Sequence, residues 1–119
     1  MHSNAIHDAL SQLLKSPITY VTLVEHNNKE YFICIGTHSF FIIDSDLESI
    51  KAEVFYAHVQ KLVIDTGKYK FLLIQLTDNR DANVPGKMIL CTENRKVLVD
   101  HIKSAWKTDH MYRLGNEWK

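Results

Sequence analysis

Hydrophobic residues change their spacing twice along the chain. They recur at helical spacing over residues 3–15, and Pro17 ends this predicted helix because proline disfavours helical geometry in the residue before it. Short runs rich in β-branched and aromatic residues then alternate with polar turns, which is the pattern of β-strands. We predict seven strands, at residues 18–25, 30–36, 39–44, 50–56, 58–65, 70–78 and 87–92.

A second amphipathic helix is predicted over residues 94–113, after Thr92, which can cap its first turn. One face of this helix is apolar and carries a tryptophan, so we expect that face to pack on the strands. The apolar face consists of Leu98, Val99, Ile102, Ala105 and Trp106. Of these, we expect Leu98, Ile102 and Trp106 to be the structural residues that fix the helix.

Composition places the chain among ordinary globular proteins. A chain of 119 residues with 45% hydrophobic content can bury one core without disulfides or metal. Lys and Arg total 14 and Asp and Glu total 14, so the formal charge is zero and nucleic acid is not an expected partner. Cys34 and Cys91 fit reduced thiols or a single disulfide. Because neither a membrane-spanning run nor a secretory signal is present, we expect a cytoplasmic location.

The order of these elements resembles a known superfold. The most specific stretch is CTENRKVLVDHIKSAW, in which a last strand leads through a capped turn into a helix that bears Trp106. This order resembles the pleckstrin-homology-like (PH-like) superfold. The resemblance implies a mainly β domain: a partly open barrel of two nearly orthogonal antiparallel sheets, seven strands in all, capped by a C-terminal helix. It covers residues 18–113, with residues 1–17 as an added N-terminal amphipathic helix and residues 114–119 as a tail.

A second, shorter stretch supports the same resemblance. The segment IGTHSFFIID is similar to the hairpin between the second and third strands in N-terminal PH-like modules of large trafficking scaffolds. A scaffold context is therefore one expectation for this chain.

Catalytic chemistry is not indicated by the residues. Cys34 and His38 are four apart, about 13 Å in an extended strand, which is too far for a nucleophile and its base. The seven histidines lack the close ligand pairs typical of zinc sites, and no nucleotide or hydrolase motif occurs. We therefore expect no enzyme activity, no catalytic residue, no metal and no cofactor. The interior is expected to be filled by large side chains, namely Phe32, Phe40, Phe71, Leu73 and Trp106.

Lipid binding is the second chemistry to consider, because the resemblance includes phosphoinositide-binding domains. Those domains carry several basic residues across the first two strands, whereas this chain has only Lys29 there, between two glutamates. A different basic cluster, around the predicted 58–70 hairpin, remains a candidate for weak attraction to anionic lipid. The candidate ligand-binding or lipid-binding residues are Lys29, Lys61, Lys68, Tyr69 and Lys70.

Two functions follow as expectations. The first is a non-enzymatic adaptor domain of an intracellular scaffold, which binds a protein or peptide along an exposed strand edge or in the groove beside the 94–110 helix. The alternative is a membrane-targeting domain that binds phosphoinositide or anionic lipid through the atypical basic site, at the periphery of a membrane. The sequence leaves open the identity of the partner, the oligomeric state, the extent of the whole protein and the docking of the N-terminal helix.

Overall fold

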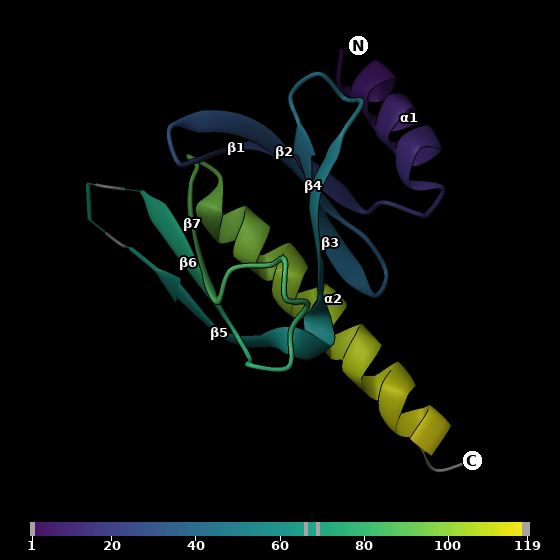
Figure 1. Cartoon of the computed structure of the whole chain (residues 1–119). Helices are drawn as coiled ribbons and strands as arrows, with labels where there is room; N and C mark the ends of the chain where they lie inside the picture. The colour runs from purple at the N-terminus through teal and green to yellow at the C-terminus, as the bar shows by residue number, and fades with distance from the viewer. Residues whose placement is uncertain (1, 66, 69, 118–119) are drawn as a thin grey trace.

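The computed structural model describes residues 2–65, 67–68 and 70–117. Within these residues, seven strands lie between two α-helices (Figure 1). The elements are α1 (His2–Leu14), β1 (Tyr20–His26), β2 (Lys29–Ile35), β3 (Ser39–Asp44), β4 (Ile50–Phe55), the short 3-10 helix η1 (Tyr56–His58), β5 (Val59–Ile64), β6 (Phe71–Leu76), β7 (Lys87–Cys91) and α2 (Arg95–Glu117).

All seven described strands belong to one antiparallel sheet, in the order β4-β3-β2-β1-β7-β6-β5. The β1–β4 half and the β5–β7 half meet at a single residue pair, Glu25 with Cys91. No described strand pairs with the outer edges of β4 and β5, so the sheet does not close into a barrel. The mainly β fold class with flanking helices is therefore confirmed, and the two predicted sheets are continuous through that one pair.

The main core lies between the inner faces of the two halves and α2. Buried strand residues such as Ile33, Phe40 and Ile74 meet Leu98 and Ile102 of α2, all with their side chains fully out of solvent. Burial of each such side chain contributes about 1.5–3 kcal/mol relative to leaving it in water. The predicted apolar face of the closing helix therefore holds the two halves together.

Strand β6 faces the opposite way from the prediction. We expected Phe71 and Leu73 in the interior, but Leu72, Ile74 and Leu76 are buried in the core, while Phe71 and Leu73 lie half-buried on the outer face. Successive strand side chains alternate between faces, so a shift of one residue reverses the whole strand.

Helix α1 covers the outer face of the β1–β3 region. Its Leu10 is fully buried in a second cluster with Cys34, Phe41 and Ile43, and Phe32 packs at the margin of this cluster. Phe32 is thus covered by α1 and does not fill the barrel interior as predicted. The helix ends at Leu14, one residue before the predicted boundary.

The turn between β2 and β3 depends on Gly36. Its N–H donates to the carbonyl oxygen of Ser39 at 3.0 Å. A Cβ at Gly36 would lie 2.8 Å from that same oxygen, so any larger residue would push the two strands apart.

Helix α2 extends further than the sequence pattern predicts. Its apolar face ends near residue 113, but the helix continues to Glu117, so most of the predicted tail is helical. Figure 1 shows that its last turns project past the sheet, where no strand covers them. Thr92 was expected to cap this helix, but the helix begins three residues later, at Arg95. The Thr92 hydroxyl instead accepts a hydrogen bond from the Asn94 N–H at 3.2 Å, within the turn that precedes the helix.

Candidate functional site

An apolar groove lies between β5, at one edge of the sheet, and α2. It encloses about 230 Å³ and is open to solvent on one side. Its lining residues come from these two elements: Val59, Gln60, Lys61, Leu62, Ile102, Lys103 and Trp106.

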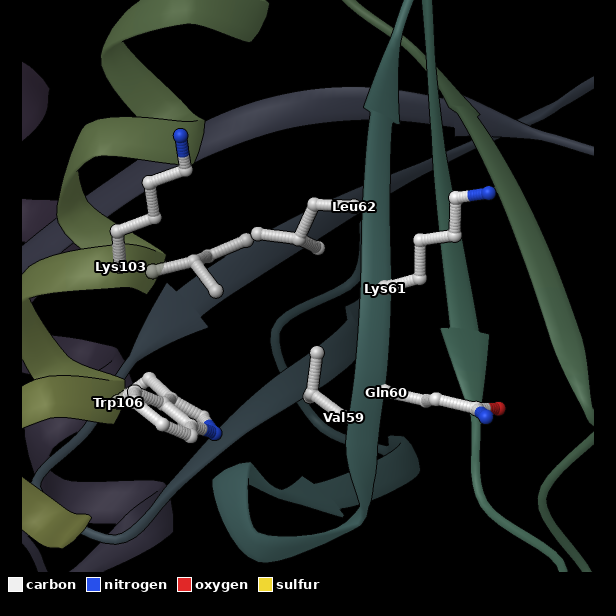
Figure 2. Close-up of a pocket in the computed structure, with 7 residues that line it drawn as sticks. Val59, Gln60, Lys61, Leu62, Lys103 and Trp106 are labelled. Atoms are coloured by element: carbon white, nitrogen blue, oxygen red, sulfur yellow. The ribbon is translucent and has the colours of Figure 1, made fainter.

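Four apolar side chains form the floor of the groove, namely Val59, Leu62, Ile102 and Trp106. Figure 2 shows Val59 and Leu62 of β5 pointing toward Trp106 of α2. The indole of Trp106 stacks on the ring of His110, with the ring centroids 4.8 Å apart and the planes 11° apart. Trp106 also packs against the core, so its ring is held in place while one side remains available to the groove.

An irregularity in β5 explains why Val59 and Leu62 both reach the groove. The pairing of β5 with β6 shifts between Val59 and Lys61, so Gln60 is an extra residue in the strand. Gln60 and Lys61 consequently both point away from α2, to the outer side of the sheet (Figure 2). This bulge gives β5 an apolar inner side and places Gln60 and Lys61 together on the outer side, ahead of Val63.

The main chain of β5 is available along the groove. Asp65, directly after the strand, donates its N–H to the Phe71 carbonyl of the β6 side at 3.0 Å. Hydrogen-bonding groups alternate in antiparallel pairs, so the main-chain groups of Leu62 and Ile64 point to the open edge. Strand β6 is the only neighbour of β5 among the described strands, which leaves these groups free to pair with another strand.

The rim of the groove is positively charged. Lys103 rises from α2 beside the floor and is exposed (Figure 2). Lys107, also exposed, follows one helical turn later on α2, beyond the residues that line the groove. Lys61 is exposed on the outer side of β5. None of these three lysines makes an ion pair with a carboxylate of the described residues.

Two of the predicted lipid-binding lysines are already paired with carboxylates. Lys29 lies 3.2 Å from Asp44, and this hydrogen bond and charge attraction raise the pKa of Lys29. Lys70 lies 2.6 Å from Glu93 and lowers the pKa of that carboxyl group. Both pairs are exposed on the surface.

The remaining predicted residues occupy different positions. Lys68 is exposed in the β5–β6 turn, and Lys61 lies within β5, whereas Lys29 starts β2 on another hairpin. Tyr69 lies outside the described residues. The predicted basic cluster therefore comes from two different hairpins, β1–β2 and β5–β6.

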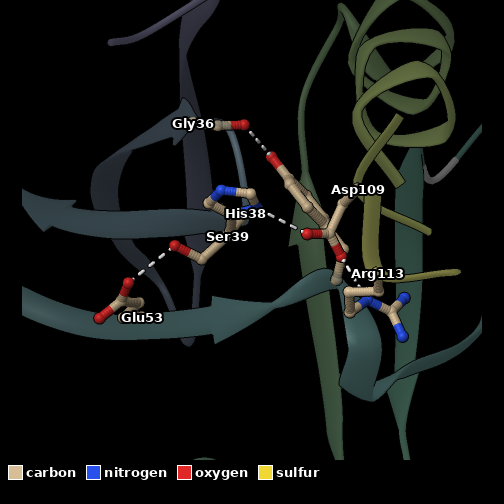
Figure 3. Close-up of polar contacts among 7 residues, drawn as sticks. Gly36, His38, Ser39, Glu53, Asp109 and Arg113 are labelled. Carbon is tan, nitrogen blue, oxygen red and sulfur yellow. Dashed lines mark hydrogen bonds and ion pairs between the residues drawn. The ribbon is translucent and has the colours of Figure 1, made fainter. Parts of the chain in front are cut away.

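A buried carboxylate fastens the first half of the sheet to α2 (Figure 3). Asp109, only 4% exposed, accepts hydrogen bonds from His38 Nδ1 at 2.7 Å and from Arg113 Nε at 2.9 Å. The neighbouring Ser39 donates to Glu53 at 2.7 Å instead of contacting His38. These hydrogen bonds hold His38 against α2 and do not align the Ser39 hydroxyl with the His38 ring.

The cysteines and histidines of the described region do not form a reactive centre. Both cysteines are free, with Cys34 buried and Cys91 exposed. Burial raises the pKa of the Cys34 thiol to about 12, so this thiol is protonated at neutral pH. Across the described residues, no three histidine, cysteine or acidic side chains gather at metal-binding distance. Neither described helix is long and apolar enough to cross a membrane.

Part of the groove was predictable from the sequence. Trp106 and Ile102 were predicted to be structural and lie at the groove floor. Val59 and Leu62 were not singled out, since nothing in the sequence announces the bulge that brings them together. The position of Asp109, seven residues after Ile102 on the apolar side of α2, was the available signal for a buried polar contact.

Comparison with solved structures supports the fold. The Drosophila Merlin structure described as the complex of the FERM and C-terminal domain matches with a TM-score of 0.65 and 16% identity, over 84% of this chain and 32% of that one. The C-terminal domain of an unknown protein from Leishmania infantum matches with a TM-score of 0.60 and 9% identity, over 89% of this chain and 98% of that one. This chain therefore spans about a third of the Merlin chain.

No protein-family model and no curated protein sequence matches the chain. At such low identities, the structural matches show a shared fold alone. They agree with the PH-like architecture that the sequence resembles. Fold and groove together define a mainly β domain with an open groove between its last helix and an edge strand.

Proposed function

We propose that this chain is a non-enzymatic protein-binding module that receives an extended segment of a partner along β5, beside α2. The observation that carries the proposal is the coincidence of an unpaired strand edge with an apolar groove that contains Trp106. An added strand would satisfy the main-chain groups of Leu62 and Ile64 by hydrogen bonds. Its side chains on the inner side would enter the groove.

The groove has the composition that peptide recognition needs. Main-chain pairing supplies affinity without regard to sequence, and side-chain pockets supply selectivity. Aromatic residues at the centre of an interface often dominate its binding energy. Trp106, held by His110 and by the core, offers a rigid surface that loses little conformational freedom on binding.

The proposal includes the setting in which the module works. A binding domain without chemistry of its own suits an adaptor in an intracellular scaffold, in the cytoplasm. The protonated state of the buried Cys34 and the engagement of His38 by Asp109 support a non-enzymatic role. Fold alone does not decide function, so the groove geometry carries the argument.

Peptide titration followed by backbone amide NMR tests this function. A library of displayed extended peptides first selects a binder, which is then added to the isotope-labelled domain. We expect the largest shift changes over residues 59–64 and 102–110. Residues 50–55 in β4, the other edge of the sheet, serve as the internal control. Changes confined to β4, or the failure of every selected peptide to bind, would contradict the proposal.

Matched aromatic substitutions identify the edge that binds. Trp106→Ala removes the groove floor and should weaken binding at least about 10-fold, as expected for an interface aromatic. Phe55→Ala removes an exposed aromatic from β4 and should leave affinity unchanged. Because Trp106 also supports the core, the amide spectrum must first show that the variant is folded. Val59→Ser makes the groove floor more polar and removes less packing than Trp106→Ala does, so it provides the second test.

Lipid binding is less well supported than peptide binding. Lys29 and Lys70 each have a carboxylate partner, which reduces the local charge available to a phosphate group. Liposome sedimentation at low and near-physiological salt tests this alternative. Strong sedimentation that Lys61→Glu with Lys68→Glu abolishes would favour a membrane-targeting function over the adaptor function.

A further inference from the structure

The two sides of β5 differ in chemistry, and any strand added beside β5 would meet the same two environments. The inner side presents Val59 and Leu62, together with Trp106 across the groove. The outer side presents Gln60 and Lys61, followed by Val63, which lies opposite the outward-facing Leu73 of β6. Residues directly beside one another on neighbouring strands share a face and lie about 4.5–5.5 Å apart at Cβ, so an added strand meets both environments in alternation.

The outer face next to the groove is basic. Lys61 lies opposite Gln75 in β6, and Gln75 lies opposite Lys87 in β7, so these three form one row across the sheet. This row contains no carboxylate to neutralise its lysines. An added strand would continue the row by placing one of its own side chains beside Lys61.

The inner rim adds charge of the same sign. Lys103 and Lys107 are one helical turn apart, about 6 Å, on the exposed side of α2.

We infer that the groove selects an extended segment with apolar inward residues and an acidic outward residue beside Lys61. This inference rests on the proposed function and specifies its ligand. The apolar residues face Leu62 and Trp106, and an acidic residue lies beside Lys61. A carboxylate at the end of the segment nearest α2 meets Lys103. Opposite charges placed directly across a strand pair attract, and a lysine in that position would be repelled.

Three peptides of equal length test the preference for an acidic residue. They share all residues except the outward one beside Lys61, which is Asp, Ser or Lys, and their affinities are measured by fluorescence anisotropy. We expect the Asp peptide to bind about two- to five-fold more tightly than the Ser peptide, as for a cross-strand ion pair, and the Lys peptide to bind more weakly. Added salt should reduce these differences because the charges are exposed.

Charge reversal in the domain locates the contact. K61E should reverse the order, so that the Lys peptide binds better than the Asp peptide. K103E should weaken the Asp peptide without reversing the order. K51E is the matched control, because it makes the same charge change at an exposed position of β4, on the opposite edge of the sheet.

The outcomes separate the inference from the function beneath it. Preference for Asp that K61E reverses and K51E leaves intact supports the inference. Equal binding of all three peptides, lost in Trp106→Ala, would overturn the inference while the peptide-binding function stands. Equal effects of K51E and K61E would also overturn it, since the charge effect would then be general. If none of the three peptides and no library peptide binds, both proposals fail.

Discussion

The outer faces of the two halves of the sheet are covered to different extents. In the β1–β4 half, α1 lies on the outer face and buries Leu10 and Cys34 completely. In the β5–β7 half, no described helix lies on the outer face, and Ile89 is 53% exposed there. Both halves carry apolar residues on this side, so the difference comes from the presence of α1 and not from strand composition alone.

The difference shows which surfaces of the sheet the chain itself covers and which remain exposed to solvent. In the β1–β4 half, a segment of the same chain covers Cys34, Phe41 and Ile43 on the outer face. The β5–β7 half leaves Ile89 exposed and carries the apolar groove beside α2. Covered surfaces contribute to stability, whereas open ones are available to a partner. Substitutions in the first half should therefore change unfolding, and substitutions around β5 should change binding.

The largest expected effect is the loss of α1 packing. Leu10→Ala should lower the free energy of unfolding by about 2–5 kcal/mol, because it removes a fully buried side chain and leaves a cavity. Leu23→Ala is the same chemical change at a position 45% exposed on β1, and it should cost less than about 1 kcal/mol. Urea unfolding of both variants measures the difference.

A small effect of Leu10→Ala would mean that α1 contributes little in solution. Equal costs for the two leucines would then remove the contrast between a covered and an open half. Deletion of residues 2–14 would distinguish these cases, since an unattached helix could be removed without loss of stability.

A smaller effect is expected where the two halves are joined. Tyr56, in the link between β4 and β5, donates its buried hydroxyl to the Gly36 carbonyl at 2.8 Å. Tyr56→Phe leaves that carbonyl without its partner and should cost about 1–2 kcal/mol. Tyr112→Phe removes a hydroxyl from a side chain 58% exposed on α2 and should be close to neutral. Thermal unfolding of the two variants at equal concentration provides the comparison, and similar midpoints would show that the Tyr56 bond is not important.

The sequence was sufficient for the elements but not for every strand face. Each of the seven strands and both helices were predicted, because their boundaries carry turn residues, Pro17 or a capping threonine. Strand β6, FLLIQL, has apolar residues at five of its six positions, so no alternation marks its inner face. Only its pairing with β5 and β7 decides that Leu72 and Ile74 point inward.

The candidate site was predictable only in outline. Trp106 and the idea of a groove beside the closing helix followed from the helix pattern. The bulge at Gln60 did not, because it depends on how β5 pairs with β6. The His38–Asp109 contact joins residues 71 apart in sequence, and no local pattern links them. Contacts of this kind arise from the tertiary fold.

The smallest effect at neutral pH, and the one most specific to the covered half, concerns Cys34. Burial under α1 raises the pKa of its thiol to about 12, against about 8.5 in an unfolded chain. Above pH 8.5 the unfolded state releases this proton first, so it is stabilised relative to the folded state. The contribution of Cys34 to stability is therefore intact below pH 8.5 and is lost as the pH rises toward 12.

Unfolding measured from pH 7 to pH 10.5 tests this. The free energy of unfolding should fall less steeply with pH in Cys34→Ala than in the unmodified chain, while Cys91→Ala, at the exposed cysteine, should keep the original slope. Some slope will remain in Cys34→Ala, because burial, with the negative charge of Asp109, also raises the pKa of Tyr56. If the slopes of Cys34→Ala and the unmodified chain coincide, Cys34 is reached by solvent in the folded state. The outer face of β2 would then be as open as that of β7, and the contrast between the two halves would not hold.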